Sequence, residues 1–141
     1  MKPPPAVSFV GPSGSGKTTL LRKVVAILVR KGYRVGVIKH SSGFADPDRR
    51  GKDSWLLRRA GARTLLLASR DRSVLFLDHP GKEPGVKARL RCFEGFDLVL
   101  VESWRAAGLP AIRVRTSPRP RPAEIAARLE RRIRSKRRFG R

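Results

Sequence analysis

The sequence lacks or is short of several residue types, and each shortage excludes a class of structure. Asparagine and glutamine are absent from all 141 residues, and Cys92 is the only cysteine, so no internal disulfide can form. A single thiol is compatible with a reducing compartment. No apolar run approaches the roughly 20 residues of a transmembrane helix, and the opening MKPPPAVSFV has too short an apolar stretch for a signal peptide. We therefore expect a cytoplasmic protein without a membrane anchor.

Acidic residues are also scarce, with 11 Asp and Glu against 33 Lys and Arg, which gives a net charge of +22. Such a charge favours anionic partners, namely nucleotides, phosphorylated cofactors, nucleic acid or an acidic protein. Genome composition or heat adaptation, which depletes amide residues, explains the bias equally well. The basic C-terminus offers only Phe139 for stacking on bases, so specific nucleic-acid binding is not expected.

What the sequence does contain is an alternation of apolar strands with amphipathic helices. The expected strands are residues 6–10, 34–39, 64–69, 73–78, 97–102 and 111–115. Helices are expected from Lys17 to a C-cap at Gly32 and over 53–62, 84–92 and 123–133. This order predicts a three-layer α/β/α fold with a mainly parallel sheet. The short link between strands 64–69 and 73–78 also allows an antiparallel hairpin insertion.

The strongest motif lies between the first strand and the first helix. GPSGSGKT, residues 11–18, fits the pattern G-x-x-x-x-G-K-[ST]. Glycines let backbone N–H groups converge on phosphate oxygens, and the helix N-terminus adds positive charge. Lys17 would bridge the β- and γ-phosphates, and Thr18 would bind Mg²⁺. The predicted phosphate-binding residues are Gly11, Ser13, Gly14, Ser15, Gly16, Lys17 and Thr18. The sequence thus predicts a P-loop NTPase-like nucleotide-binding domain over 1–133, followed by a basic tail over 134–141.

A P-loop also needs an acid on a neighbouring strand to hold the metal. Glu102 and Asp97 stand at opposite ends of the strand DLVLVE, and Glu102 is preferred because ligands gather at the carboxyl ends of parallel strands. The loop after the second strand leaves from the same edge. Its Asp46 is a candidate for metal binding and catalysis, with Asp48 beside it, although Asp-Pro-Asp is also ordinary turn chemistry.

Two further residues at the end of the second strand are candidates. Lys39 could neutralise phosphate charge. His40 could contact phosphate or simply be a satisfied histidine at the end of a strand. Asp53 is first of all a candidate helix cap.

Several stretches together resemble one family, that of molybdopterin-guanine dinucleotide biosynthesis protein B (MobB). They are GPSGSGKTTLLRKVV, RKGYRVGVIKHSS, DPDRRGKDSWLLRRAGA, LLASRDR and DLVLVE, and the match runs over residues 6–115. The resemblance implies a dimeric, GTP- and Mg²⁺-binding protein, weakly hydrolytic at most. Such a protein assists the guanylyltransferase that attaches GMP to molybdopterin. Carried over, it assigns the phosphate loop 11–18, the Walker-B-like acid Glu102, the loop acids Asp46, Asp48 and Asp53, and the basic residues Arg72 and Arg115.

The chain departs from the family pattern in three places. ESWR, residues 102–105, replaces Glu-Gly-Phe-Lys and loses the glycine, and SSGF, residues 41–44, replaces a histidine-rich stretch. TSPRPRP, residues 116–122, runs directly into the last helix where the family has a further strand. Guanine recognition by Asn-Lys-x-Asp is impossible without asparagine, so a preference for GTP over ATP rests on the resemblance. Backbone groups near 115–117 or a partner subunit would have to recognise the base.

Two other functions remain open. A small-molecule or nucleotide kinase would need an acceptor site and an arginine-rich lid. Arginines 49, 50, 58 and 59 could serve, but no discrete lid insertion is apparent. A nucleic-acid-associated protein driven by charge would lose affinity steeply with salt.

Overall fold

The computed structural model describes residues 3–41, 43, 46–104 and 108–138. The chain forms two compact units, one of residues 1–41 with 85–141 and the other of residues 42–84. Among the described residues, no helix is both long enough and apolar enough to cross a membrane.

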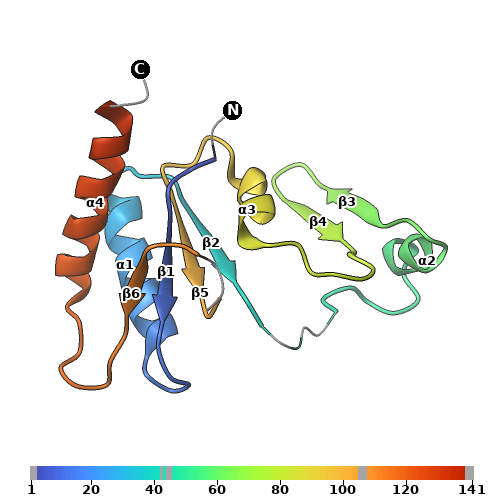
Figure 1. Ribbon diagram of the computed structural model, residues 1–141. Helices are drawn as coiled ribbons and strands as arrows, with labels where there is room; N and C mark the ends of the chain where they lie inside the picture. The colour runs from blue at the N-terminus through green and yellow to red at the C-terminus, as the bar shows by residue number, and fades with distance from the viewer. Residues whose placement is uncertain (1–2, 42, 44–45, 105–107, 139–141) are drawn as a thin grey trace. The chain divides into compact units, whose positions relative to one another are not determined.

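The first unit is built on a four-stranded parallel sheet (Figure 1). Its strands are β1 (Ala6–Val10), β2 (Val35–Lys39), β5 (Leu98–Glu102) and β6 (Ala111–Arg113), in the order β2-β5-β1-β6. Glu102 pairs in register with Phe9 on one side and with Lys39 on the other. The carboxyl ends of these strands therefore meet at one edge, as the alternation of elements predicted.

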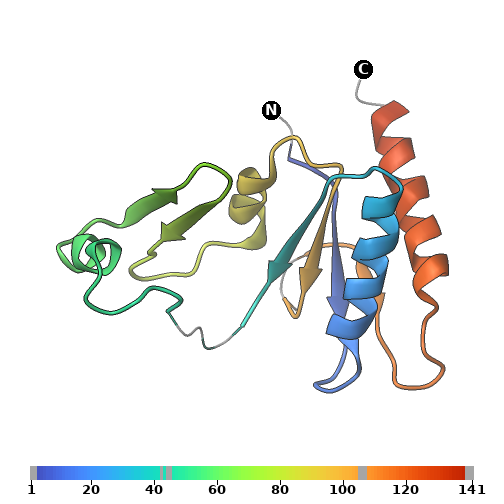
Figure 2. The same cartoon turned by 180° about the vertical axis from the view of Figure 1, so that it is seen from behind.

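Helices cover both faces of this sheet, which confirms the predicted three-layer arrangement (Figures 1 and 2). Helices α1 (Lys17–Arg30) and α4 (Pro122–Arg138) pack side by side on one face, and the short helices α3 (Val86–Arg89) and η1 (Leu90–Phe93) lie on the other. Fully buried side chains such as Phe9, Leu28, Leu100 and Leu129 form the first core. Burial of each such side chain contributes about 1.5–3 kcal/mol.

The last helix is longer than the sequence analysis predicted. It begins at Pro122 and continues to Arg138, well past residue 133, so much of the expected basic tail is helical. Proline is well suited to the first helical position, and arginine is a good helix former. The strand before this helix is shorter than predicted: β6 ends at Arg113, whereas the expected strand continued to residue 115.

The second unit holds α2 (Asp53–Arg59) and a separate two-stranded antiparallel sheet of β3 (Thr64–Ala68) and β4 (Ser73–Leu77). The predicted hairpin insertion is thereby confirmed, with Ala68 opposite Ser73. Its turn is closed by a 2.8 Å hydrogen bond from the Ser69 N–H to the Arg72 carbonyl. Leu66 and Leu75, which pair across the two strands, are 61% and 48% exposed.

Candidate functional site

The glycine-rich loop follows β1 and leads directly into α1. Gly14 and Gly16 have φ values of 72° and 83°, in the left-handed region that favours glycine. Gly16 is the N-cap of α1 and offers no side chain to cap the first turn. The N–H groups of that turn therefore point to the site with no side-chain partner, which is the arrangement that binds phosphate oxygens.

Position 11 requires glycine because other atoms lie too close for a side chain, and not because of its φ value. A Cβ atom at this position would lie 2.5 Å from the Val114 carbonyl oxygen and 2.9 Å from the Ser15 Oγ. No side chain can fit there, because the loop passes directly over the end of β6. Ser13 and Gly14 are exposed on the outer part of the loop.

Lys17 folds back over the loop. Its Nζ donates hydrogen bonds to the Gly11 carbonyl at 2.9 Å and to the Pro12 carbonyl at 2.5 Å. The ammonium group is thus held at the mouth of the cradle that the loop N–H groups form. A bound phosphate would offer this cation stronger, charge-assisted hydrogen bonds than two carbonyls do.

Thr18 and Glu102, the two residues predicted to bind the metal, are in direct contact. The Thr18 hydroxyl donates a hydrogen bond to Glu102 Oε1. Glu102 is the last residue of β5 and only 4% exposed, and this hydroxyl is the hydrogen-bond partner of its carboxylate among the described residues. A buried carboxylate is costly without a compensating cation or hydrogen bonds, so the pair is suited to receive Mg²⁺. Asp97, the alternative acid, instead accepts a 2.8 Å hydrogen bond from the Arg34 N–H at the opposite end of the strand.

Ser15 supplies a second sign that the site fits a ligand. Its Oγ is buried and has no hydrogen-bond partner among the described residues. An unpaired buried hydroxyl costs free energy unless a ligand or water satisfies it. The glycine cradle, the buried carboxylate and this hydroxyl together match a Mg²⁺-bound polyphosphate. The described residues hold no cluster of three or more His, Cys, Asp or Glu side chains that could hold a metal ion.

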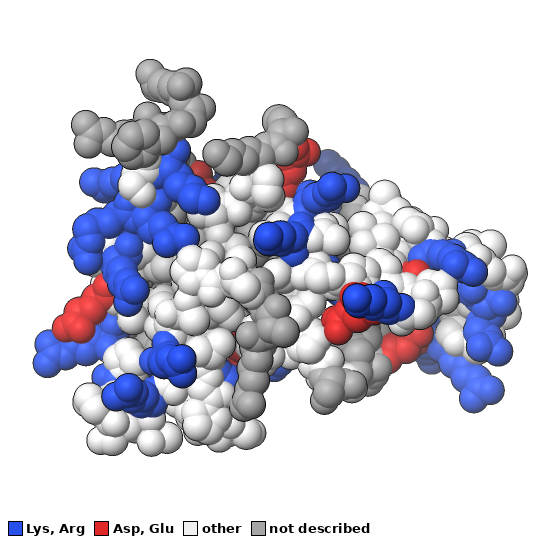
Figure 3. Space-filling model, viewed as in Figure 1, with Lys and Arg blue, Asp and Glu red and all other residues white. Residues whose placement is uncertain are grey.

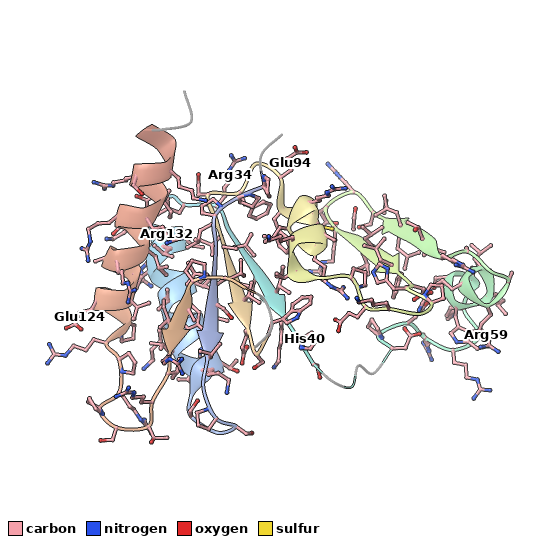
Figure 4. All side chains as sticks on the ribbon, viewed as in Figure 1. Arg34, His40, Arg59, Glu94, Glu124 and Arg132 are labelled. Carbon is pink, nitrogen blue, oxygen red and sulfur yellow. The ribbon has the colours of Figure 1, made fainter. Side chains whose placement is uncertain are left out.

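The end of β2 holds Lys39 and His40 (Figure 4, which labels His40). Lys39 is exposed and lies in register with Glu102. The His40 N–H donates a 3.0 Å hydrogen bond to the Glu102 carbonyl. Its ring stacks on Trp104 with centroids 4.6 Å apart. The stacking gives His40 a structural contact at the strand end, and its contact with phosphate stays a prediction.

Trp104 is the residue at this edge that the sequence analysis missed. It is 8% exposed and packs with Val99 and Val101 of β5, and the Arg89 guanidinium lies 5.4 Å from the centre of its ring. The sequence signal that could have identified Trp104 is an aromatic residue two positions after the carboxyl end of a buried strand.

Asp46 and Asp48 belong to the second unit, where both contact Arg58. Arg58 Nη1 lies 3.0 Å from Asp46 Oδ2 and 3.3 Å from Asp48 Oδ2. Arg58 Nη2 lies 3.1 Å from Asp78 Oδ1. The hydrogen bond from Arg58 lowers the pKa of Asp46, and the hydrogen bond to Asp78, followed by that to Asp46, raises the pKa of Arg58. Here the acids hold the 46–48 segment, α2 and the end of β4 together.

The two other candidates from this unit lie in its turns and helix ends. Asp53 is the first residue of α2, with Lys52 as the N-cap, so it adds negative charge to the first turn without acting as the cap itself. Arg72 is the last residue of the hairpin turn, and its N–H donates a 3.2 Å hydrogen bond to Ser69 Oγ.

Arg115 borders a cavity of about 550 Å³ beside the phosphate loop. The cavity is lined by Gly11 and Pro12 of the loop, and by Ala111, Arg113 and Arg115 on and after β6. Arg113 was not among the residues predicted from the sequence. Its position two residues before Arg115 places both side chains on the same face of an extended segment.

Comparisons with known proteins identify the family of this chain. The family model for MobB, molybdopterin guanine dinucleotide synthesis protein B, matches residues 6–132. A molybdopterin-guanine dinucleotide biosynthesis adapter protein of Haemophilus influenzae is 36% identical over 120 residues, covering 84% of this chain and 67% of the relative. The protein of the same name from Escherichia coli K12 is 39% identical over 105 residues, covering 72% and 59%. The chain thus spans about two thirds of the first relative and less of the second.

Solved structures share the fold. A MobB homologue from Bacillus stearothermophilus has a TM-score of 0.56 at 29% identity, covering 77% of this chain and 62% of that one. Bacillus subtilis MobB has a TM-score of 0.63 at 23% identity, covering 87% and 72%. From the match over residues 6–132 and the P-loop built around Lys17, Thr18 and Glu102, the chain belongs to the MobB family of P-loop nucleotide-binding proteins.

Proposed function

We propose that this chain is an adapter in the synthesis of molybdopterin guanine dinucleotide, and that it holds GTP with Mg²⁺ at the P-loop. The observation that carries the nucleotide-binding part is the hydrogen bond between Thr18 and the buried Glu102, beside a glycine cradle with an unpaired Ser15 hydroxyl. The pathway assignment is supported by the names of the curated relatives, which are adapter proteins.

In this proposal each part of the loop has one task. The loop N–H groups bind phosphate oxygens, and Lys17 exchanges its two carbonyl partners for the β- and γ-phosphates. The Thr18 hydroxyl binds Mg²⁺, with Glu102 holding the metal directly or through water. Lys39, at the neighbouring strand end, adds positive charge at the same edge.

The proposed role is to hold the nucleotide, with weak hydrolysis at most. Asp46 and Glu102 were the two predicted catalytic acids, and both stay predictions. Arg58 lowers the pKa of Asp46, and a carboxylate with a lowered pKa is a weaker general base. Asp46 also stays a predicted metal ligand. To bind a metal ion, its carboxylate would first have to leave its ion pair with Arg58.

We further propose that the cavity beside the loop holds the guanine base. Arg113 and Arg115 border it, and arginine pairs well with the O6 and N7 acceptors of guanine. Adenine presents an N6 donor where guanine presents O6, so the same arginines would disfavour ATP. This arrangement replaces the asparagine-based recognition that the sequence cannot provide.

The proposed partners are molybdopterin, the guanylyltransferase of the pathway and a second copy of the chain. The apolar side chains of the second unit support the dimer. The exposed ones are Leu56, Leu57, Leu66, Leu67, Val74, Leu75 and Leu77. Exposed apolar surface of this extent is typical of an interface between proteins.

The nucleotide proposal is tested by calorimetric titration with GTP and ATP, with and without Mg²⁺. We expect the unmodified protein to bind GTP in a Mg²⁺-dependent manner and Lys17→Ala to lose about 100-fold or more in affinity, because two charge-assisted contacts to phosphate disappear. Lys23→Ala removes an exposed lysine from the same helix and is the matched control. Unchanged affinity in Lys17→Ala would contradict the site.

The choice between adapter and kinase is tested with GTP labelled at the γ-phosphate. In this proposal, label appears only slowly as free phosphate. Transfer of the label to an added small-molecule or nucleotide acceptor would refute the adapter proposal and favour the kinase.

A further inference from the structure

The outer edge of β6 is an open strand edge in the part of the chain that the structure describes. β6 is the last strand in the order β2-β5-β1-β6. The Ser8 N–H donates to the Pro110 carbonyl, and the Val114 N–H donates to the Val10 carbonyl. In a parallel ladder, this register turns the N–H and C=O groups of Ala111 and Arg113 away from β1. Those groups are available to another extended chain.

A row of arginines lies beside this edge. Arg128, Arg131 and Arg132 of α4 line a cavity of about 400 Å³ together with Ala111 and Ile112 of β6. Their spacing of three and four residues places them on one side of the helix. Figure 4 labels Arg132 between α4 and the sheet. The cavity therefore combines an apolar floor, an open backbone edge and a cationic wall.

These arginines have no acidic partner among the described residues. Glu130 of α4 pairs with Lys31 and Arg134, and Glu124 pairs with Arg121. The Nε of Arg132 is buried and has no hydrogen-bond partner among the described residues. Figure 3 shows Lys and Arg side chains gathered over α4 with few acids between them. Guanidinium groups without an acidic partner, one of them with a buried Nε–H, favour an anionic occupant of the cavity.

We propose that this groove binds an acidic, extended segment of a partner protein, which adds to β6 as a further strand. Backbone hydrogen bonds at Ala111 and Arg113 would provide affinity. Carboxylates at alternate positions of the segment would face α4 and pair with Arg128, Arg131 and Arg132. A second copy of this chain is disfavoured as the occupant of this arginine-lined groove, because the chain has only 11 acidic residues against 33 basic ones. A nucleic acid is disfavoured because it cannot continue the hydrogen-bonding pattern of a strand edge.

The test uses a labelled peptide of about eight residues that alternates glutamate with valine, a length within the natural range of strands. Binding is measured by fluorescence anisotropy at physiological salt. Two matched peptides are compared, one with glutamine for glutamate and one with the same residues sorted into a glutamate block and a valine block. We expect the alternating acidic peptide to bind at least about tenfold more tightly than either. Equal binding of the two acidic peptides, or no binding, would overturn the proposal.

Variants of the protein separate strand addition from diffuse charge attraction. Arg128→Gln with Arg131→Gln should weaken binding at least about tenfold. The control is Arg121→Gln with Arg134→Gln, which removes the same charge from two exposed side chains outside the cavity, one directly before α4 and one within it. Equal losses in both double variants would show that only overall charge matters and would refute the groove.

Ala111→Pro removes an outward N–H without changing charge, and proline is tolerated at strand edges. This variant should bind the alternating acidic peptide at least about tenfold more weakly, and its affinity for a single-stranded oligonucleotide should be unchanged. In the unmodified protein, the peptide should slow hydrogen exchange at the amides of Ala111 and Arg113. An oligonucleotide that binds more tightly than the peptide, with no protection of these amides, would identify a nucleic-acid surface instead. Ala111 also lines the cavity proposed for guanine, so the separate report on the nucleotide function comes from GTP binding by the Arg128→Gln, Arg131→Gln variant, whose side chains line the groove and not that cavity.

Discussion

At the scale of single residues, Ser103 carries a backbone conformation that serine rarely adopts. It follows Glu102 directly and has a φ of 65°, the one positive φ recorded for a described residue other than glycine. The MobB pattern has glycine at this position, and the sequence analysis noted its loss. The sequence alone could not tell whether the backbone had changed with the residue. The φ of Ser103 lies in the region that a glycine would favour, so serine bears the strain.

Ser103→Gly should therefore stabilise the protein. A left-handed conformation costs a residue with a Cβ about 1–2 kcal/mol, and glycine gives back about 0.5–1 kcal/mol through its greater freedom when unfolded. We expect the free energy of unfolding to rise by about 0.5–1 kcal/mol, measured by urea denaturation. Ser135→Gly, in helix α4, is the control and should lower the same quantity. A decrease in Ser103→Gly would show that the side chain makes a contact worth more than the strain.

At the scale of elements, α1 and α4 are joined by an ion pair. Lys31, the C-cap residue of α1, donates a hydrogen bond to Glu130 of α4. This contact, with smaller contributions from Tyr33 and Arg134, lowers the pKa of Glu130 below its ordinary 4.5. A carboxyl group whose pKa is lowered on folding stabilises the folded state above its unfolded pKa. That stability is lost as the pH falls through the lowered pKa.

Glu130→Gln should thus be less stable than the unmodified protein at pH 7, and the difference should shrink below pH 4.5 and vanish once the lowered pKa is passed. Thermal unfolding across this range measures it. Glu124→Gln is the control on the same helix, because its pair with Arg121 is exposed and contributes little at any pH. A stability difference for Glu130→Gln that persists unchanged into strong acid would rule out the ion pair as its cause.

Elements with strong periodicity were the predictable part of this molecule. The strands ending at Val10 and Glu102, the helix from Lys17 and the hairpin at 64–77 follow from apolar pattern and turn chemistry. The carboxyl-edge rule identified Glu102 as the strand-end acid, and it contacts Thr18. The pairing of Arg58 with three aspartates could not be predicted, because charged turn residues have no periodicity that reveals their partners.

At the scale of the whole molecule, the proposed dimer predicts the effect of charges in the hairpin. Leu66 and Leu75 oppose each other across β3 and β4 on one face, and both are exposed. Replacing both with lysine places like charges at an apolar interface and should convert the dimer to a monomer. Light scattering with size-exclusion chromatography measures the mass, and Arg70→Lys in the hairpin turn is the control. A dimer that survives the double change would place the interface elsewhere.

The contact between Gly11 and Val114 has a consequence for the whole molecule. Since no side chain fits between the phosphate loop and the carbonyl that follows β6, the loop cannot shift toward that strand without displacing it. An occupant of the loop and an occupant of the β6 edge therefore act on one shared piece of backbone. If either one changes the affinity for the other, thermodynamic linkage makes the factor the same in both directions. The nucleotide would then regulate the attachment of the partner, and the partner would in equal measure retain or release the nucleotide.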